Sequence, residues 1–388
     1  MKAGIFFFGS IYERTGAGKV VRSFAESIQQ FSNNGIEATV FDLSSNGSVN
    51  INKSNQTKRI KGQLRDLIAR TSIGTKFCIE NLYFKKGKIV FDKYIKSSNK
   101  YDVFIFHEIF TCWAYIDYCE KNNISPQKYI LVLHTNGEVY KMLKIYYPKL
   151  CNTKYEKDLN YRSIKCFENA GLIVFVSNKS EQHFNIMFNN KYKIKTRVVY
   201  NGIPNLQKES FPSFDGDLKI VTVGTVNARK NQIMQIDCIQ RVLSKTNVFL
   251  TIVGDGDKLD ECKKRANELG VNNNVSFLGA RDDIPDILSE SNIFLMSSFD
   301  EGLPISAIEA MRSKLPLILT DVGGNCELVD GNGFLVNPTI ESITKHILML
   351  SEDRRLQKAM SKKSYELFLN KFSIESMINN YSSLIKEL

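Results

Sequence analysis

The segment from Ile293 to Lys314 constrains the fold more than any other part of the 388-residue chain. Its apolar run, Ile293 to Met296, predicts a buried strand. Gly302 allows a tight turn after that strand, and Pro304 suits the first turn of a helix, where its missing N–H costs nothing. A helix is expected to continue from there toward Lys314. Buried strand, turn and helix in this order are typical of an α/β fold.

The start of this helix also predicts a kind of ligand. The first turn leaves backbone N–H groups without partners, which favours a bound phosphate group. The residues around that turn are Gly302, Leu303, Pro304 and Ile305. Glu301 precedes the helix, whereas Glu309 lies inside it among Ala, Ile and Met. A carboxylate in such a helix suits hydroxyl recognition better than solvent exposure. The expected ligand therefore carries both phosphate and hydroxyl groups, as a nucleotide sugar does.

Size and composition limit the possible classes of protein. At 388 residues the chain is long for one core, so two domains are expected. No apolar run approaches the roughly 20 residues that span a bilayer. Met1 and Lys2 lead directly into a strand, without a signal-peptide pattern. The eight cysteines are scattered and show no metal-ligand spacing, so we expect reduced thiols, no bound metal and a cytoplasmic location.

The net charge of +11 is unevenly distributed. Residues 1–205 hold 31 Lys and Arg against 16 Asp and Glu, and the remaining residues hold 21 against 25. The basic first half predicts contact with an anionic partner, either nucleic acid or an anionic membrane surface. No nucleic-acid motif accompanies the basic and aromatic residues between 138 and 168, so we expect no nucleic acid. A lysine-rich composition bias is the alternative explanation.

Residues 58–96 combine basic and apolar side chains, as a surface that touches lipid headgroups does. The periodicity of this stretch is not sharp. A solvated insertion on the acceptor side of the site gives the same composition, so both interpretations stay open.

The first strand, Lys2 to Phe8, is followed by a loop that contains Gly16 and Gly18 and then by an apolar-periodic helix. Strand, glycine loop and helix outline a phosphate-binding arrangement. The glycine fingerprint is incomplete and a Walker lysine is missing, so a plain tight turn is the alternative.

Two histidines follow buried strands in the first half. His107 comes after Asp102 to Phe106, and His134 comes after Tyr129 to Leu133. Ligands of open α/β sheets bind beyond the carboxyl ends of the strands, so either histidine could position an acceptor or a sugar hydroxyl. The alternative is a histidine that caps its strand through backbone hydrogen bonds.

A basic pair, Arg229 and Lys230, lies in the loop after the strand Lys219 to Val223. Arg can bind two phosphate oxygens with its planar fork, and Lys adds a point charge, so the pair suits a diphosphate. Solvated charges at a helix start are the alternative.

These residues resemble the retaining glycosyltransferases of family four. Glu301 and Glu309, with seven residues between them, match the family's paired-glutamate motif. The resemblance continues through Leu315 to Val329 and Asn332 to Val336, and Asn201-Gly202-Ile203 resembles the family's interdomain linker. One departure is Thr225, which stands where the family usually has an arginine, and Arg229 would substitute for that arginine from the far side of the loop.

The family resemblance implies a GT-B fold, in which two Rossmann-like domains face each other across a cleft. On this basis residues 1–205 form an acceptor-side domain and residues 206–371 a nucleotide-sugar domain. Residues 372–388 form a helix that crosses back to the first domain. The glycine of the linker, Gly202, is expected to permit the bend between the domains.

The resemblance also implies roles for individual residues. Glu301 would bond the transferred sugar and His134 would act beside it as the second catalytic residue. Glu309 would form hydrogen bonds with the ribose. The segment from Leu278 to Arg281, with Leu278 and Arg281 at its ends, would contact the nucleobase. Other donor-binding residues would be Gly16, Gly18, Arg229, Lys230, Gly302, Leu303, Pro304 and Ile305. Gly323 and Gly324 are expected to form a concavity of backbone amides.

The implied activity is a metal-independent, retaining hexosyl transfer without a cofactor. The donor would be a UDP- or GDP-sugar, and the acceptor a hydroxyl of a glycan or a lipid-linked glycan in bacterial surface polysaccharide (lipopolysaccharide or capsule) synthesis. If the acceptor lies at the inner face of the plasma membrane, the protein would be a peripheral membrane protein. Alternatives are another GT-B enzyme, such as a nucleotide-sugar epimerase or an inverting transferase, and a non-catalytic sugar-nucleotide binder.

Overall fold

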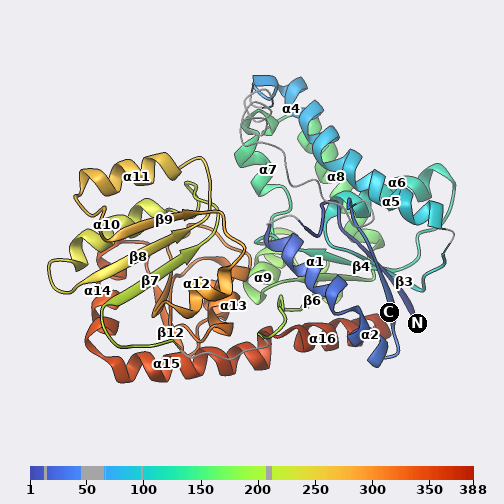
Figure 1. Ribbon diagram of the computed structural model, residues 1–388. Helices are drawn as coiled ribbons and strands as arrows, with labels where there is room; N and C mark the ends of the chain where they lie inside the picture. The colour runs from blue at the N-terminus through green and yellow to red at the C-terminus, as the bar shows by residue number, and fades with distance from the viewer. Residues whose placement is uncertain (13–14, 45–64, 66, 98, 207–211) are drawn as a thin grey trace. The chain divides into compact units, whose positions relative to one another are not determined.

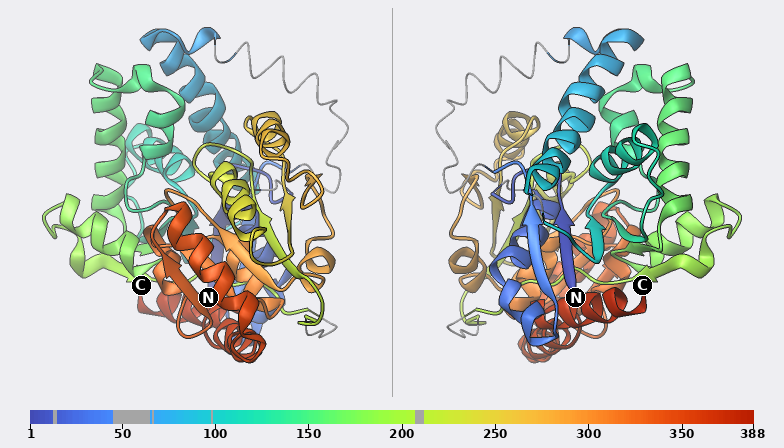
Figure 2. Two further views of the ribbon diagram at one scale, coloured as in Figure 1. Left: turned by 90° about the vertical axis from the view of Figure 1, so that its left-hand side faces the viewer. Right: turned by 90° about the vertical axis from the view of Figure 1, so that its right-hand side faces the viewer.

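The computed structural model describes residues 1–388 apart from 13–14, 45–64, 66, 98 and 207–211 (Figure 1). The chain forms two compact units, Met1–Val199 with Ile378–Leu388, and Tyr200–Met377. Within the described residues, each unit contains one six-stranded parallel sheet, with helices on both of its faces (Figure 2). The predicted α/β fold of two Rossmann-like domains is confirmed.

The sheet of the first unit has the strand order β2-β1-β3-β4-β5-β6. Its strands are β1 (Lys2–Phe6), β2 (Glu37–Phe41), β3 (Val103–Phe106), β4 (Tyr129–Leu133), β5 (Leu172–Phe175) and β6 (Thr196–Val198). Its α-helices are α1 (Gly16–Glu26), α2 (Ile28–Asn33), α4 (Ser72–Ile79), α5 (Lys85–Ser97), α6 (Ile109–Lys121), α7 (Lys141–Tyr146), α8 (Lys154–Asn169) and α9 (Asn178–Met187). Shorter turns are η1 (Glu80–Phe84), η2 (Pro148–Leu150) and η3 (Lys193–Lys195).

The first strand is shorter than the sequence predicted, and a partly buried carboxylate explains why. The amide of Phe7 still donates to the carbonyl of Phe41, at 3.0 Å. The amide of Phe8 instead donates to the carboxylate of Glu108, at 3.1 Å, so the chain leaves the sheet there. Glu108 lies beyond β3, and its contact with Phe8 joins the loops that follow β1 and β3.

The sheet of the second unit has the order β12-β11-β10-β7-β8-β9. Its strands are β7 (Leu218–Val223), β8 (Val248–Val253), β9 (Val275–Gly279), β10 (Ile293–Met296), β11 (Leu317–Thr320) and β12 (Gly333–Val336). Its helices are α10 (Gln232–Val242), α11 (Leu259–Glu268), α12 (Ile284–Ser289), α13 (Ile305–Arg312), α14 (Ile340–Glu352) and α15 (Arg354–Leu367), with the turns η4 (Gly323–Glu327) and η5 (Phe368–Phe372).

The last helix, α16 (Ile374–Glu387), belongs to both units. Its residues from 378 onward group with the first unit, where Asn34 donates to the side chain of Asn379 at 3.0 Å and the ring of Tyr381 lies 5.1 Å from that of Phe24. At its start, Gly202 packs so closely on Ser373 that an added Cβ would overlap the Ser373 carbonyl. Close packing therefore requires glycine at this position.

Both strand orders place a reversal point beside the loops that carry the predicted site residues. In the second sheet β7 and β10 are neighbours, and the chain continues from β7 toward one edge of the sheet and from β10 toward the other. In the first sheet it does so from β1 and β3. Open α/β sheets bind ligands at the carboxyl ends of such strand pairs, because the connecting helices diverge there and leave a crevice.

Candidate active site

The loops after β7 and β10 are held together by hydrogen bonds. The amide of Phe299 donates to the carbonyl of Arg229 at 2.9 Å. The hydroxyl of Ser297 donates to the carbonyl of Asn231 at 2.8 Å, and it accepts from the side chain of Gln235 at 2.9 Å. Ser297 is fully buried, so these bonds are shielded from water. They fix the spacing between the basic pair on one loop and Glu301 on the other.

Arg229 and Lys230 converge on a single carboxylate oxygen of Glu301. The Arg229 Nη1 lies 2.9 Å and the Lys230 Nζ 2.7 Å from Glu301 Oε1. Burial alone would raise the pKa of Glu301, but the charges of Lys230 and Arg229 outweigh it and hold that pKa below its usual value. Two cations facing one anion leave a net positive charge, which suits a further anion such as a diphosphate.

The aliphatic part of Lys230 is positioned by a glycine. Gly224 follows β7 with a φ of 155°, and an added Cβ would lie 3.4 Å from Lys230 Cε. Lys230 thus lies over the backbone of the strand end, and only 12% of its side chain is exposed. Thr225, which replaces the arginine expected from the resemblance, accepts a hydrogen bond from Gln232 through its carbonyl at 3.1 Å.

The backbone of Glu301 is held by η4, a contact that no sequence pattern predicted. An added Cβ at Gly323, whose φ is +50°, would overlap the carbonyl of Glu301. The amide of Gly324 donates to that same carbonyl at 3.2 Å. The expected amide concavity is therefore wrong at Gly324, because its N–H already has a partner. The double glycine is the sequence feature that could have indicated this contact, but Glu301 lies 22 residues before Gly323.

Helix α13 begins one residue later than expected. Pro304 is the residue before the helix, with ψ at 117°, and Ile305 is its first residue. The helix ends at Arg312, because Lys314 adopts a left-handed φ of +63°. Among the described residues, no hydrogen-bond acceptor faces the amides of Gly302, Leu303, Ile305 and Ser306. Leu303 and Ile305 are buried, and the carbonyl of Pro304 accepts from Ala307 at 3.1 Å, which fixes this turn.

Glu309 is buried in α13, with 8% of the residue exposed. It lies one turn before Arg312, whose guanidinium donates to the carbonyl of Pro204 at 2.8 Å. Burial lowers the pKa of Arg312, and the negative charge of Glu309 opposes that shift. Glu309 is therefore a buried, charged neighbour of Arg312 within the second unit.

Leu278 and Arg281 lie outside this cluster. Both are exposed, and Arg281 pairs with Asp283, with 2.8 Å between Nε and Oδ1. No hydrogen bond or ion pair of the described residues joins either of them to Arg229, Lys230 or Glu301. Their strand end is tied to the turn after β8 by the amide of Gly254, which donates to the carbonyl of Gly279 at 2.8 Å.

In the first unit, Gly16 and Gly18 lie within the first turn of α1 rather than in the loop before it. Thr15 is the N-cap, and its hydroxyl accepts from the amide of Gly18 at 3.1 Å. The Gly18 amide is therefore not available to a phosphate, and Gly18 is buried whereas Gly16 is exposed.

His107 and His134 contact each other beyond the ends of β3 and β4. His107 Nδ1 lies 3.0 Å from His134 Nε2, and the ring planes differ by 19°. Burial lowers the pKa of both rings, to about 4 for His134. The adjacent Glu108 is partly buried and accepts from Phe110 and Thr111; desolvation of its carboxylate raises its pKa to about 7. Two histidines that the sequence offered separately thus form a pair of neutral imidazoles.

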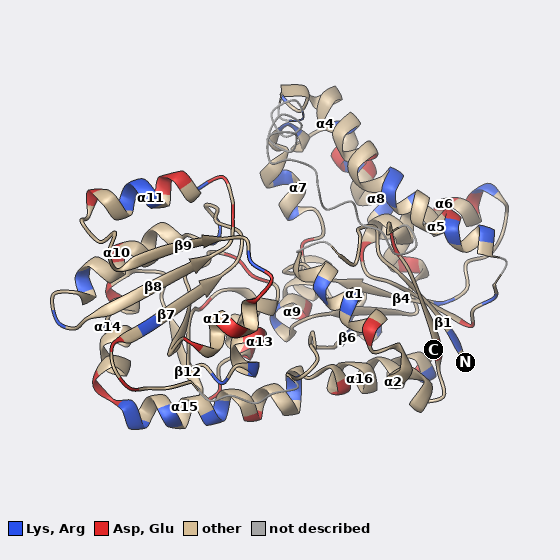
Figure 3. Ribbon diagram, viewed as in Figure 1, with Lys and Arg blue, Asp and Glu red and all other residues tan. Residues whose placement is uncertain are grey.

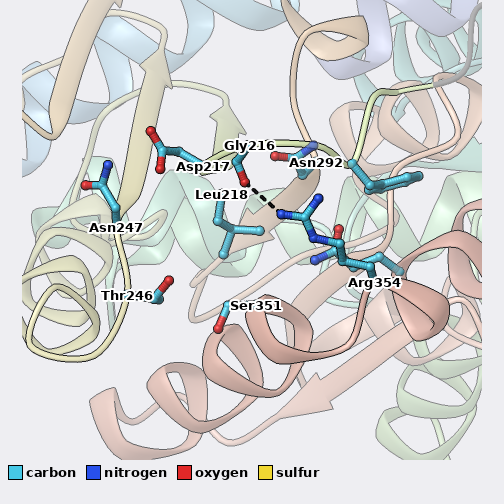
Figure 4. Close-up of a pocket in the computed structure, with 10 residues that line it drawn as sticks. Gly216, Asp217, Leu218, Thr246, Asn247, Asn292, Ser351 and Arg354 are labelled. Carbon is cyan, nitrogen blue, oxygen red and sulfur yellow. Dashed lines mark hydrogen bonds between the residues drawn. The ribbon is translucent and has the colours of Figure 1, made fainter.

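A cavity of about 100 Å³ in the second unit lies at the opposite edge of the sheet (Figure 4). Leu218, the first residue of β7, and Asn247, which precedes β8, line it. Arg354 reaches into it and donates to the carbonyl of Gly216 at 3.2 Å. None of the predicted site residues lines this cavity, so it is separate from the candidate site.

The two-sheet architecture is the GT-B fold. Residues 205–367 match the family model described as "Glycosyl transferases group 1". Among curated proteins, the O-antigen biosynthesis glycosyltransferase WbnH of Escherichia coli is 30% identical over 192 residues, which cover 49% of this chain and 53% of the relative.

A second curated relative from Escherichia coli is the UDP-Gal:alpha-D-GlcNAc-diphosphoundecaprenol alpha-1,3-galactosyltransferase. It is 28% identical over 211 residues, which cover 49% of this chain and 54% of the relative. The chain thus spans about half the length of the curated relatives it matches. Among solved structures, Anabaena HepE in complex with UDP and glucose has a TM-score of 0.71 at 19% identity, with both chains fully covered. This likeness extends the fold to both units.

The described helices include none that is both long and apolar enough to cross a bilayer.

Proposed function

We propose that this protein is a glycosyltransferase that moves a sugar from a UDP- or GDP-sugar to a hydroxyl of a glycan or lipid-linked acceptor. The match of residues 205–367 to group 1 glycosyltransferases supports the reaction class. The names of the Escherichia coli relatives support a place in bacterial surface polysaccharide synthesis. The observation that carries the proposal is the convergence of Arg229 and Lys230 on Glu301, beside the partnerless amides at the start of α13.

In this reaction the bond between the anomeric carbon and the diphosphate oxygen breaks, and its electrons stay with the diphosphate. Lys230 and Arg229 stabilise the negative charge that develops there, together with the amides of Gly302, Leu303, Ile305 and Ser306. The acceptor oxygen bonds to the anomeric carbon, and its proton passes to the departing phosphate oxygen. These fixed protein charges take the part that a divalent cation has in other transferases, so we propose a metal-independent reaction without a cofactor.

The carboxylates and His134 have separate roles in this proposal. Glu309 accepts hydrogen bonds from the ribose hydroxyls, and Glu301 accepts hydrogen bonds from the transferred sugar. The negative charge of Glu301 also stabilises the positive charge that develops at the anomeric carbon. His134, in the first unit, bonds a sugar or acceptor hydroxyl. Gly16 lies near the donor diphosphate, and Leu278 and Arg281 contact the nucleobase. The bound anion would draw Lys230 and Arg229 partly away from Glu301, which frees that carboxylate for the sugar.

Product analysis tests the reaction class. We expect the protein to release a nucleoside diphosphate from a UDP- or GDP-hexose, slowly to water and faster when a glycan acceptor is present, and to retain the α-configuration of the donor. A β-linked product would identify an inverting transferase, and a changed hexose without diphosphate release would identify an epimerase. Donor binding without any turnover would identify a binding protein.

We further propose that the first unit binds an anionic membrane surface through exposed apolar residues of α4 and α7. Basic charge alone does not single out this unit, because Lys and Arg also line α15 (Figure 3). Ile73 and Phe77, one turn apart on α4, are 85% and 58% exposed. Ile145 and Tyr146 on α7 are 54% and 58% exposed. Exposed bases beside them are Arg65, Arg70, Lys76 and Lys149.

Contacts place these two apolar groups in one region of the unit. The hydroxyl of Ser72, at the start of α4, donates to the carbonyl of Lys149 at 3.3 Å, and Lys149 lies in the turn that follows α7. Apolar side chains flanked by cations suit an anionic lipid interface. Part of the stretch predicted as interfacial, residues 58–64 and 66, lies outside the described residues.

Cosedimentation with lipid vesicles tests this surface. The double variant Ile73→Ser/Phe77→Ser should bind vesicles that contain phosphatidylglycerol at least roughly tenfold more weakly, because each buried apolar side chain contributes on the order of 1 kcal/mol or more. Ile194→Ser is the matched control: Ile194 is 86% exposed and flanked by lysines, but lies in η3. Equal binding by the double variant and the control would overturn the proposal, as would equal binding of the parent to neutral and anionic vesicles.

A further inference from the structure

The contact between His107 and His134 has a consequence for how His134 meets a ligand. His107 is fully buried, whereas His134 is partly exposed. The rings of Phe24 and Tyr381 lie 5.1 Å and 6.2 Å from that of His107. His107 Nε2 lies among these rings without a hydrogen-bond partner in the described residues. The contact with His134 is therefore the one polar contact that the described residues offer the His107 ring.

A distance of 3.0 Å between two ring nitrogens requires one proton between them. Both rings are neutral, since burial holds their pKa values well below 6.5. Glu108 is the carboxylate adjacent in sequence, and its oxygens accept from Phe8, Phe110 and Thr111 rather than from either histidine. Two arrangements of protons then remain.

If His134 donated from Nε2, His107 would carry its own proton on Nε2, and this N–H would be buried without an acceptor. If His107 donates from Nδ1, its Nε2 is a bare nitrogen that leaves only a lone pair unused. Buried N–H groups without acceptors are rarer in proteins than buried acceptors without donors, so the second arrangement is favoured. His134 must then carry its proton on Nδ1, because its Nε2 accepts.

We propose that His107 is a positioning residue that fixes the tautomer and the ring orientation of His134, so that His134 presents an Nδ1–H to its ligand. A fixed N–H donor selects an oxygen with a free lone pair, such as a sugar hydroxyl or a phosphate oxygen, and excludes a donor-only group such as an ammonium. The tautomer assignment stands on the contact itself. Only the identity of the ligand rests on the proposed function.

NMR of the full-length protein labelled with ¹⁵N-histidine tests the assignment without any activity measurement. Long-range ¹H–¹⁵N correlation spectra distinguish protonated from bare ring nitrogens, and the chain has four histidines, which single His→Gln variants assign. We expect both His107 and His134 to be protonated on Nδ1 and bare on Nε2 at neutral pH. A proton on Nε2 of either ring would overturn the proposal.

Two variants separate positioning from packing. Asn places an amide donor near the position of His107 Nδ1, whereas Leu removes the donor and keeps an apolar side chain. His107→Asn should preserve the Nδ1–H form of His134, and His107→Leu should leave His134 as a mixture of tautomers. In transfer assays His107→Leu should lower kcat roughly 10- to 100-fold, with nucleotide affinity unchanged and partial recovery in His107→Asn. Equal losses in both variants would show a packing role only.

The NMR spectra and the transfer assays test different parts of the proposal. If His134→Ala transfers sugar as fast as the parent, the proposed contact of His134 with the substrate is wrong, yet the tautomer measured in the parent still decides the role of His107.

Discussion

Replacing Lys230 with methionine removes one charge from the centre of the candidate site and keeps most of the side-chain volume. Lys230 Nζ lies 2.7 Å from Glu301 Oε1, and 12% of the lysine side chain is exposed. A charge-assisted hydrogen bond contributes roughly 1.5–3 kcal/mol. Loss of that contact to a bound diphosphate should therefore weaken UDP or GDP binding by roughly 10- to 100-fold, as measured by isothermal titration calorimetry.

The same variant should lower stability less than a typical broken buried ion pair. Removing one partner of such a pair costs roughly 3–5 kcal/mol, because it leaves the other charge unpaired. Here Arg229 Nη1 remains 2.9 Å from the same oxygen of Glu301. We therefore expect a loss of roughly 2 kcal/mol, or a decrease in Tm of about 4–8 °C by differential scanning calorimetry.

The matched control for this prediction is Lys258→Met. Lys258 also pairs with a glutamate in the second unit, Glu261, but its side chain is 37% exposed. Solvent screens this pair, so its loss should change stability little, and nucleotide affinity should not change. If Lys230→Met bound UDP and GDP within twofold of the parent while the control did the same, Lys230 would not contact the diphosphate and the account of the cluster would be refuted.

Other predictions concern the surroundings of Lys230. Glu301→Gln should remove an acid-sensitive part of the stability: because the folded-state pKa of Glu301 is depressed, its contribution is present above about pH 4.5 and disappears as the pH falls through the folded pKa. The Tm of the variant should therefore change less between pH 3 and 7 than the Tm of the parent. Parallel plots of Tm against pH for the two proteins would show that the ion pairs of Glu301 do not stabilise the fold. Gly323→Ala should cost roughly 2–4 kcal/mol, because its φ is +50° and its Cβ would overlap the Glu301 carbonyl. Gly270→Ala, with a φ of +68° in open space, should cost only roughly 1–2 kcal/mol in the same denaturant titration. Equal costs for the two glycines would show that Gly323 does not support Glu301.

The sequence predicted the two-unit α/β fold because its buried strands are short apolar runs with clear ends. Tyr129–Leu133 and Ile293–Met296 were placed to the residue. The strands β11 and β12 and the short edge strand β6 were not identified as strands. Thr196–Val198 has only three residues and reads as part of the linker that follows, so its pairing with β5 decides its structure.

The candidate site was only partly accessible from the sequence. The adjacent Arg229 and Lys230 and the turn at Gly302 carry local signals that a pattern can show. Other contacts depend on residues far apart in the chain, such as Gly323 with Glu301 in the second unit and His107 with His134 in the first. No spacing rule predicts these pairs, because they follow from the strand order and from the register of neighbouring strands.

The capping of Gly18 shows why a local pattern can mislead. A glycine pair after a strand predicts free amides for a phosphate, but Thr15 supplies a hydroxyl that occupies one of them, at 3.1 Å. A threonine three residues before the helix interior is itself a capping signal. The Gly18 amide could donate either to a phosphate or to the N-cap, and in this structure it donates to the hydroxyl of Thr15.

A crystal structure of the protein with bound UDP or GDP would show whether the charged cluster binds the diphosphate. We expect diphosphate oxygens within hydrogen-bonding distance of Lys230 Nζ and of the amides at the start of α13, with Glu309 at the ribose hydroxyls. A diphosphate bound elsewhere, with Lys230 still paired only to Glu301, would contradict this expectation.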